Sequence, residues 1–368
     1  MQERASSLRP RAPLRIQAKL SFRGKAEGRM MSVSGVILHV GAGKTGSSAV
    51  QTFLAHNRGA LIDAGVDYPA DPHAPDGYMG GNARPLARFA AKPAEPKARA
   101  APTKLRTALA PIVEDAHASR LILSNEQIFK AGAAKLAVIR EALAGLDRQP
   151  VIVCVFRELA SHAVSVYSQL VRNHCETRLL PEFLKRHEPP FLSAARALKS
   201  VFGPDQVRFK VYARDPADNL RRFLQAAEIE GLKPPANPAP VNRSLTAHEI
   251  GVMRHLNALD LPPAVRRQTL QRIADTLTAQ SPAPDDASAE PHALEPAVWD
   301  RLARLTEAIN AECFAPGEGL PEPPRTVPDR SQPYAALDPQ TARLAELTAA
   351  GFAEVAALRN AAAAQRRR

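Results

Sequence analysis

The chain reads Val36-Ile37-Leu38-His39-Val40-Gly41-Ala42-Gly43-Lys44-Thr45-Gly46-Ser47-Ser48 close to its start. The apolar residues that open this stretch predict a short buried strand, and the glycines that follow predict a tight turn. A helix is expected next, because Val50, Phe53 and Leu54 recur at a spacing of about 3.6 residues. A strand, a glycine-rich turn and a helix N-terminus make a cradle for an anion, because backbone N–H groups, the helix dipole and a lysine supply positive potential there.

We call residues 41–48 the lysine loop. It differs from the Walker A pattern, which has a glycine five residues before the Gly-Lys pair, where this chain has Leu38. No predicted strand ends in an aspartate suited to holding magnesium. The lysine loop is therefore expected to bind a phosphate-like group without a metal. The alternative is a structural turn that merely exposes Lys44, but the hydroxyl groups of Thr45, Ser47 and Ser48 beside it favour an anion site.

The composition suits one large globular domain. The chain has 368 residues, of which 45% are hydrophobic, and it contains no run of about 18 apolar residues that would span a membrane. Its three cysteines, Cys154, Cys175 and Cys313, are scattered and form no metal-ligand pattern. An odd number of separated cysteines is typical of a reducing compartment, so we expect a cytoplasmic protein.

The net charge of +12 is concentrated at one end of the chain. Residues 1–34 hold eight Lys or Arg residues against two Glu residues, which gives +6 and leaves +6 for the rest. This segment lacks the apolar region of a secretory signal and is expected to be a disordered extension. A basic targeting or nucleic-acid-binding arm is the alternative, and the sequence does not decide whether translation starts at Met1 or at Met30 or Met31. The remaining positive charge favours an anionic ligand.

Apolar runs alternate with helical patterns along the rest of the chain. Strands are predicted at residues 36–40, 120–123, 151–156 and 207–212. Helices are predicted at residues 104–118, 135–146, 160–173, 191–202, 245–259 and 262–277. This alternation predicts a three-layer α/β/α fold with a central parallel sheet and extra C-terminal helices. The third predicted strand is apolar without interruption, which is typical of a central parallel strand.

One domain is expected to cover residues 35–314. Residues 315–368 are expected to add a proline-rich loop and a helix at 338–360 that pack on the same domain. Loops are predicted at residues 69–103, with one short helix near 83–90, and at 174–190, 231–240, 280–296 and 315–336. Long loops are often functional, so the first two are expected to shape a substrate pocket.

A second anion site is predicted at the end of the strand 151–156. Arg157 follows this strand directly, at the edge of the sheet where open α/β folds bind ligands. Ser165 comes eight residues later on the next helix, so a guanidinium and a hydroxyl can hold one phosphate from two sides. Ser161 is a competing ligand or a helix cap. The alternative is that Arg157 pairs with Glu158 and that Ser165 is a helix-surface residue.

Two anion sites on one sheet suit a ligand with phosphates at both ends of a nucleoside. Lys44-Thr45-Gly46-Ser47-Ser48, together with Arg157, Ser165 and Tyr167, resembles the motifs of the P-loop sulfotransferases, which use 3′-phosphoadenosine 5′-phosphosulfate. The resemblance covers about residues 36–260. Further segments similar to the bacterial carbohydrate-type members are Gln51, Leu54, Asn57, Gly65-Val66, Tyr68-Pro69, Leu123-Ser124-Asn125-Glu126 and Asn242-Arg243-Ser244-Leu245. Gly43 is a departure, because many members have a larger residue or a proline before the lysine.

This resemblance implies a P-loop NTPase-like topology and a sulfuryl transfer to a hydroxyl or amine of a small-molecule or glycan acceptor. It implies that Lys44 stabilises the leaving oxygen, and that Arg157 and Ser165 hold the 3′-phosphate. The 5′-phosphate would be held by the backbone N–H groups of Thr45, Gly46, Ser47 and Ser48, and Gly43 and Lys44 would complete the cofactor-binding loop. No metal is implied.

A general base must remove the proton of the acceptor. Glu126 is the first candidate, because it follows the predicted strand 120–123 and would lie over the same sheet edge; the alternative is a glutamate favoured at a helix start by the dipole. His73 and Asp76 are reserves in the long loop. Asn82 is a candidate contact for acceptor or cofactor, and His39 is expected to be a core histidine.

Other functions remain open at this stage. The first alternative is a P-loop nucleotide or small-molecule kinase, which would need magnesium and a triphosphate. The second is a non-catalytic nucleic-acid-binding protein, although aromatic residues are only 5% and do not interleave with the basic ones, so no specific nucleic-acid partner is expected. The sequence leaves the acceptor and the oligomeric state undetermined. A cluster comprising Arg172, Arg178, Lys185 and Arg186 suggests an anionic acceptor, with a solvated helix face as the alternative.

Overall fold

The computed structural model describes residues 35–74, 81–92, 101–145, 150–235, 245–259 and 291–329, together with 270, 273, 347, 348, 350, 351 and 354. All of them belong to one compact unit, Ser32–Arg368. Several predictions concern residues outside this set and stay predictions: the N-terminal extension, Asp76, the segment 242–244, and most of the helices at 262–277 and 338–360.

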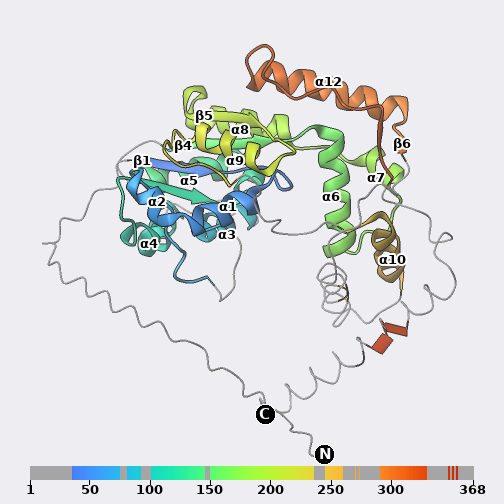
Figure 1. The fold of residues 1–368 in the computed structure, drawn as a ribbon, viewed down its shortest axis with the longest axis horizontal. Helices are drawn as coiled ribbons and strands as arrows, with labels where there is room; N and C mark the ends of the chain where they lie inside the picture. The colour runs from blue at the N-terminus through green and yellow to red at the C-terminus, as the bar shows by residue number, and fades with distance from the viewer. Residues whose placement is uncertain are drawn as a thin grey trace, which may run out of the picture. The chain divides into compact units, whose positions relative to one another are not determined.

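A five-stranded parallel sheet forms the centre of the fold, with the strand order β2-β3-β1-β4-β5 (Figure 1). Its strands are β1 (Gly35–His39), β2 (Val66–Asp67), β3 (Arg120–Ser124), β4 (Val151–Phe156) and β5 (Val207–Val211). The strand predictions for β1, β3, β4 and β5 are confirmed. β2 was not predicted, because a strand of two residues is too short to show an alternating pattern.

Helices cover both faces of this sheet. Those between the sheet strands are α1 (Ser47–His56), α2 (Arg58–Asp63), α3 (Arg84–Ala91), α4 (Ala101–Glu114), α5 (Ala133–Ala144), α6 (Leu159–Asn173), α7 (Leu180–Arg186) and α8 (Phe191–Phe202). Those after β5 are α9 (Pro216–Ala226), α10 (Ala247–Ala258) and α12 (Pro296–Cys313). Two 3₁₀ turns, η1 (Glu126–Lys130) and η2 (Pro204–Gln206), precede α5 and β5.

The two faces of the sheet bury separate hydrophobic clusters. Ile37, Ile122 and Val153 pack with α1, α2 and α9 on one face. Their neighbours in the same strands, such as Leu38 and Cys154, pack on the other face with α3, α4, α5, α6 and α8. Alternate residues of a strand point to opposite faces, so continuous apolar strands bury both faces. The predicted three-layer fold is therefore confirmed, with helices α10 and α12 added beyond the last strand of the sheet.

The connections of the sheet diverge between β1 and β4. The chain leaves β1 through α1 toward β2 at one edge of the sheet, and it leaves β4 through α6 toward β5 at the other edge. Open parallel sheets bind ligands at such a switch point, beyond the carboxyl ends of the strands. The lysine loop follows β1 and Arg157 follows β4, so the topology brings the two predicted anion sites to this point.

Some loops predicted from sequence contain regular structure. Helix α7 lies within the predicted loop 174–190; at seven residues it is too short to show a clear helical period, although Pro181 suits a first turn. Strands β6 (Pro291–Ala293) and β7 (Thr326–Pro328) pair in antiparallel fashion within segments predicted as loops. Three-residue strands give no readable alternation, and their pairing depends on residues far apart in the chain.

Candidate anion-binding site

Side chains hold the backbone of the lysine loop through its carbonyl groups. Its carbonyl groups at residues 42–45 each accept a hydrogen bond from a side chain. For the carbonyl groups of residues 42, 43, 44 and 45 in turn, the donors are Thr45 Oγ1, His162 Nε2 (3.0 Å), Arg157 Nη1 (3.1 Å) and Asn219 Nδ2 (3.3 Å). The backbone N–H groups of residues 43–48 have no acceptor among the described residues. Because side chains bind the carbonyl groups, the N–H groups of the loop stay available to an anion.

Two residues of the lysine loop adopt left-handed backbone conformations. Lys44 has a φ of 70° and Gly46 has a φ of 82°. A left-handed residue within a turn brings successive N–H groups to the same side, which is the geometry of an anion-binding nest. At Gly46 a side chain is also excluded by space, because a Cβ atom would lie 2.5 Å from Asn219 Nδ2 and 3.2 Å from the ring of Tyr212.

Replacing Gly46 with alanine is expected to lower the free energy of unfolding by about 1–3 kcal/mol, because it adds left-handed strain and pushes on Asn219. Urea denaturation measures this change. Gly43→Ala is the matched control, since no atom lies within 4 Å of a Cβ placed at Gly43. Equal stability of the two variants would show that the contact with Asn219 does not constrain the loop.

Arg157 and Ser165 meet as the sequence predicts. Arg157 Nη1 donates to Ser165 Oγ at 3.1 Å, and the same nitrogen lies 3.1 Å from the Lys44 carbonyl oxygen. The guanidinium also lies 5.1 Å from the centre of the Tyr212 ring, a distance that permits a cation–π interaction. One side chain therefore touches both predicted anion sites.

Other residues near this motif are occupied by the protein itself. The carboxylate of Glu158 caps α6, because it accepts hydrogen bonds from the N–H groups of Ala160 (2.6 Å) and Ser161 (2.7 Å). Tyr167 is fully buried, and its hydroxyl donates to the Arg178 carbonyl at 2.8 Å. Tyr167 is thus a core residue in this structure and does not point to the lysine loop.

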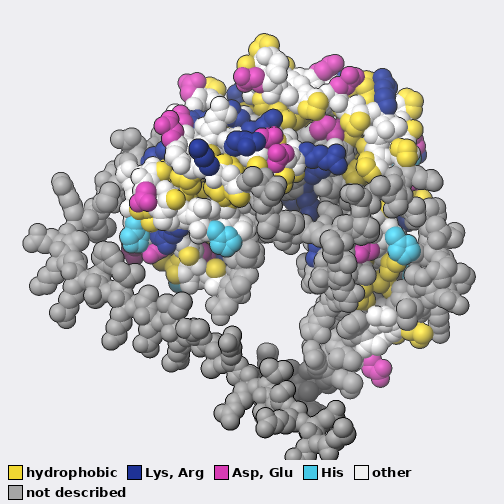
Figure 2. Space-filling model, viewed as in Figure 1, with side chains coloured by type: hydrophobic (Ala, Val, Ile, Leu, Met, Phe, Trp, Pro, Cys, Tyr) yellow, Lys and Arg dark blue, Asp and Glu magenta, His cyan; other side chains and the backbone are white. Residues whose placement is uncertain are grey.

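The charges around Lys44 are mostly positive. Its pKa lies below the ordinary lysine value, first because nearby protein removes part of its hydration and then because the guanidinium groups of Arg172 and Arg157 repel its charge. Glu126 acts in the opposite direction and raises this pKa. Lys44 as a residue is still exposed. Figure 2 shows Lys and Arg side chains gathered beside the part of α6 that lies closest to the sheet in Figure 1. An anion would relieve the repulsion among these cations.

Glu126, the first candidate for the base, is the first residue of η1, and its charge acts on Lys44. Its neighbour Asn125 caps this turn by accepting a hydrogen bond from the Gln127 N–H group at 3.0 Å. Glu126 is partly buried. The reserve candidate His73 is exposed, and its backbone N–H group donates to Asp71 Oδ1 at 2.9 Å.

A buried polar cluster lies next to Gly41, the first residue of the lysine loop. His39 Nδ1 lies 2.9 Å from Ser124 Oγ, which also accepts from Gln51 Nε2 at 3.1 Å. Burial lowers the pKa of His39 to about 4, so it stays neutral, as expected of a core histidine. Asn82 joins the same cluster; its amide bonds to the Ile122 carbonyl and to the Ser124 N–H group, both at 2.9 Å. The structure thus gives Asn82 a structural role in place of the predicted ligand contact.

The predicted basic cluster is divided in the structure. Arg178 pairs with Glu176 at 2.6 Å and Lys185 pairs with Glu295 at 2.8 Å. Arg172 lies near Lys44 instead, and Arg186 is exposed. Charges that are neutralised by carboxylates attract an anionic acceptor weakly, so the four residues do not act as one patch.

Three residues that contact the lysine loop were not predicted from the sequence. Asn219 lies 174 residues from its partner Thr45, and nothing local to it indicates this contact. Tyr212 packs against Gly46 and Arg157. His162 did carry a signal, because it is a polar residue that lies between Arg157 and Ser165 in the sequence, on the helix that carries Ser165.

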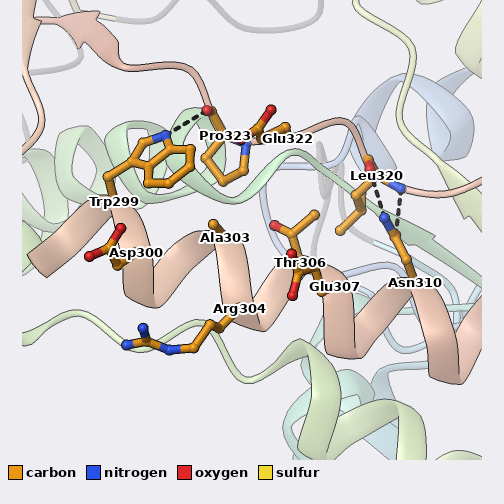
Figure 3. A pocket seen from close by; sticks show the side chains of 10 residues that line it. All are labelled: Trp299, Asp300, Ala303, Arg304, Thr306, Glu307, Asn310, Leu320, Glu322 and Pro323. Atoms are coloured by element: carbon orange, nitrogen blue, oxygen red, sulfur yellow. Dashed lines mark hydrogen bonds between the residues drawn. The ribbon is translucent and has the colours of Figure 1, made fainter. Parts of the chain in front are cut away.

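A pocket of about 490 Å³ lies between α12 and residues 320–323 (Figure 3). It is lined by Trp299, Asp300, Ala303, Arg304, Thr306, Glu307, Asn310, Leu320, Glu322 and Pro323. Trp299 Nε1 donates to the Pro323 carbonyl at 2.9 Å, and the Asn310 amide bonds to both backbone groups of Leu320. These bonds fasten the chain after α12, and none of the lining residues belongs to the candidate site.

Within the described ranges, no three His, Cys, Asp or Glu residues come together in a group that could hold a metal ion. In the same part of the chain, no helix has both the length and the apolar character needed to cross a membrane.

No family model matches this chain, and no curated protein matches it. The crystal structure of a sulfotransferase from Alicyclobacillus acidocaldarius is similar, with 16% sequence identity and a TM-score of 0.35; the match covers 64% of this chain and 95% of the other. Similarity at this level leaves the function to be argued from the residues themselves.

Proposed function

We propose that this protein is a sulfotransferase that moves a sulfuryl group from 3′-phosphoadenosine 5′-phosphosulfate to a hydroxyl or amine of a small-molecule or glycan acceptor. The contact that carries the proposal is the bridge made by Arg157, whose guanidinium bonds both to the lysine loop and to Ser165. A nucleotide with phosphates at its two ends suits two cationic sites that share one side chain. The motif resemblance supports the same ligand.

The proposed roles follow from the local chemistry. The N–H groups of residues 45–48 and the N-terminus of α1 would hold the 5′-phosphate. Arg157 and Ser165 would hold the 3′-phosphate, because a guanidinium donates parallel hydrogen bonds to phosphate oxygens. Lys44 would neutralise the charge that develops on the leaving oxygen.

The transfer itself is an in-line displacement at sulfur. A bond forms between the acceptor oxygen or nitrogen and the sulfur, while the bond from the sulfur to the 5′-phosphate oxygen breaks. The nucleotide leaves as 3′-phosphoadenosine 5′-phosphate. The proton of the acceptor passes to Glu126, the carboxylate closest in sequence to the end of β3 and an electrostatic neighbour of Lys44.

Calorimetric titration with 3′-phosphoadenosine 5′-phosphate, in the absence of magnesium, tests this proposal. We expect micromolar binding by the wild-type protein, weakened about 10–100-fold in Arg157→Ala because a charge-assisted hydrogen bond is lost. Arg196→Ala is the matched control, since it removes the same charge from an exposed ion pair with Glu312.

Two results would contradict the proposal. If the wild-type protein bound magnesium–ATP but not 3′-phosphoadenosine 5′-phosphate, a kinase activity would explain the lysine loop better. If Arg157→Ala and Arg196→Ala bound the nucleotide equally well, Arg157 would not be a ligand of the phosphate.

A further inference from the structure

The strained residue of the lysine loop is Lys44. Its φ of 70° lies in the left-handed region, which residues with a side chain adopt rarely and at a cost in free energy. Such strain at a candidate site raises the question of which contacts enforce it.

Two side-chain contacts fix the backbone on either side of Lys44. The carbonyl of Gly43 belongs to the peptide plane that precedes the Lys44 Cα atom, and the carbonyl of Lys44 belongs to the plane that follows it. His162 Nε2 binds the first carbonyl at 3.0 Å, and Arg157 Nη1 binds the second at 3.1 Å. Because the orientations of these two planes define φ and ψ of Lys44, the two bonds together hold it in the left-handed conformation.

His162 is well suited to a fixed contact. It is 4% exposed and lies on α6, with the Phe191 ring 4.7 Å and the His187 ring 6.4 Å from its own centre. A carbonyl only accepts hydrogen bonds, so Nε2 carries the proton and Nδ1 does not. Burial, followed by the charge of His187, lowers the pKa of His162 to about 3, so the ring stays neutral near neutral pH. Nδ1 has no partner among the described residues.

Gly43 permits a second orientation of the Gly43–Lys44 peptide plane, in which its carbonyl no longer faces His162. It has no side chain, and no atom lies within 4 Å of the place where a Cβ would be. Gly43 therefore has no side chain that would oppose a rotation of the peptide plane between Gly43 and Lys44. If its carbonyl is released, this rotation would change ψ of Gly43 and return Lys44 to a relaxed negative φ. The same rotation would turn the Lys44 N–H group away from its present direction.

We propose that His162 is a positioning residue, which holds the Gly43–Lys44 peptide plane in the orientation that leaves the Lys44 N–H group available to a bound anion, next to the N–H groups of residues 45–48. This inference rests on the anion-binding part of the proposed function. It assigns His162 no contact with the nucleotide and no proton transfer; the residue acts through the Gly43 carbonyl.

Three variants test the inference. His162→Leu removes the donor, and His162→Gln keeps an N–H donor on a side chain of similar reach. His187→Leu is the matched control, because it removes a neighbouring histidine whose side chain makes no described contact with the lysine loop. Thermal melting first establishes that all three proteins are folded.

The decisive readout is a crystal structure of His162→Leu without nucleotide, compared with wild-type crystals. We expect the Gly43 carbonyl to be rotated and φ of Lys44 to be negative. In calorimetry, 3′-phosphoadenosine 5′-phosphate should bind His162→Leu about tenfold more weakly, the usual effect of one lost hydrogen bond. His162→Gln should recover most of this affinity, and His187→Leu should match the wild-type protein.

A positive φ at Lys44 in His162→Leu would overturn the inference, whatever the affinity. A rotated peptide with unchanged affinity would also overturn it, because the orientation would then be irrelevant to the anion. If the wild-type protein binds no 3′-phosphoadenosine 5′-phosphate, the proposed function fails, and the crystal structures still decide whether His162 holds the loop.

Discussion

Replacing Lys44 with alanine is expected to lower turnover by about 10²–10³-fold, the usual effect of removing one preorganised charge from a transition state. Nucleotide affinity should fall much less, because the 5′-phosphate would still be held by backbone N–H groups of the lysine loop. Charge on the leaving oxygen is larger in the transition state than in the bound sulfuryl donor, so loss of the lysine should act mainly on kcat. The measurement is release of 3′-phosphoadenosine 5′-phosphate from the sulfuryl donor across a panel of hydroxyl-bearing and amine-bearing acceptors.

Lys185→Ala is the control for this experiment, because it also removes one positive charge, from an exposed pair with Glu295. Its turnover should equal that of the wild-type protein. A Lys44→Ala enzyme that keeps turnover within a few-fold of wild type would exclude Lys44 from the chemical step.

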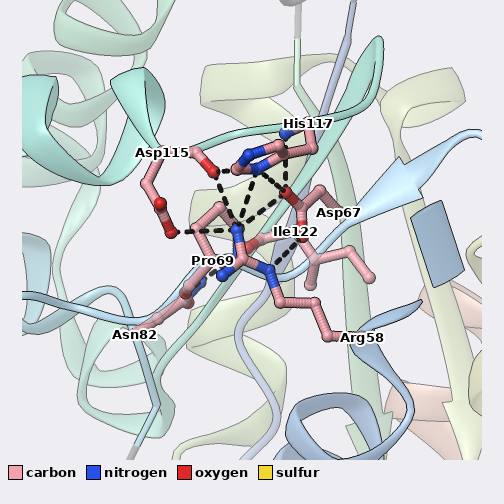
Figure 4. Close-up of polar contacts among 7 residues, drawn as sticks. All are labelled: Arg58, Asp67, Pro69, Asn82, Asp115, His117 and Ile122. Carbon is pink, nitrogen blue, oxygen red and sulfur yellow. Dashed lines mark hydrogen bonds and ion pairs between the residues drawn. The ribbon is translucent and has the colours of Figure 1, made fainter. Parts of the chain in front are cut away.

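Replacing Arg58 with alanine is expected to lower the free energy of unfolding by about 3–5 kcal/mol, because it leaves a buried charge without its partner. Arg58 binds Asp67 through two nitrogens, at 2.7 and 3.0 Å (Figure 4). The Asp67 side chain has no exposed surface. Arg58 also donates to the Asp115 carbonyl at 2.7 Å, so one guanidinium links α2, β2 and the segment before β3.

The cost of losing Arg58 should depend on pH. Burial by itself would raise the pKa of Asp67, but the hydrogen bonds from Arg58 and from the His117 N–H group outweigh it and lower this pKa. In the wild-type protein Asp67 therefore stabilises the fold above its unfolded pKa, and this contribution is lost as the pH falls through its lower folded pKa. Without Arg58, burial dominates and raises this pKa, so the variant should begin to recover part of its deficit as the pH falls toward the unfolded value of about 4. The deficit should shrink further below it, where the wild-type protein loses the contribution of the ion pair.

Urea denaturation at neutral and acid pH measures both effects. Arg221→Ala is the control, since Arg221 pairs with Asp218 on an exposed helix face and should matter little. A deficit in Arg58→Ala that is no larger than in Arg221→Ala, or that does not shrink in acid, would contradict the assigned role of the ion pair.

The sheet could be predicted from sequence because its strands carry long apolar runs. β4 is buried on both faces, and its uninterrupted apolar residues show this directly. β2, β6 and β7 have two or three residues each, which is too few to show an alternating pattern. Their pairing also depends on partners far away in the sequence. The stripe of α12, with Val298, Leu302 and Ile309 buried, was present in the sequence but not assigned to a helix.

In the candidate site too, contacts between residues close in sequence could be predicted, and contacts between distant residues could not. Arg157 and Ser165 are eight residues apart on a strand end and a helix, so their meeting follows from local geometry. The contacts of His162 and Asn219 with the lysine loop span 119 and 174 residues, and only the folded chain brings them together. The sequence also gives no sign of which charges form ion pairs, since Lys185 pairs with Glu295, more than a hundred residues away.

The anchoring of the loop carbonyls has a consequence for the transfer of this motif between proteins. Three of the four anchors come from residues outside the stretch 36–48, one at the end of β4 and the others on α6 and α9. A graft of that stretch onto another parallel sheet would carry the glycines and the lysine without the groups that orient them. The unit that would have to be transplanted is the strand–loop–helix together with Arg157, α6 and α9, because these parts hold the carbonyl groups of the candidate site.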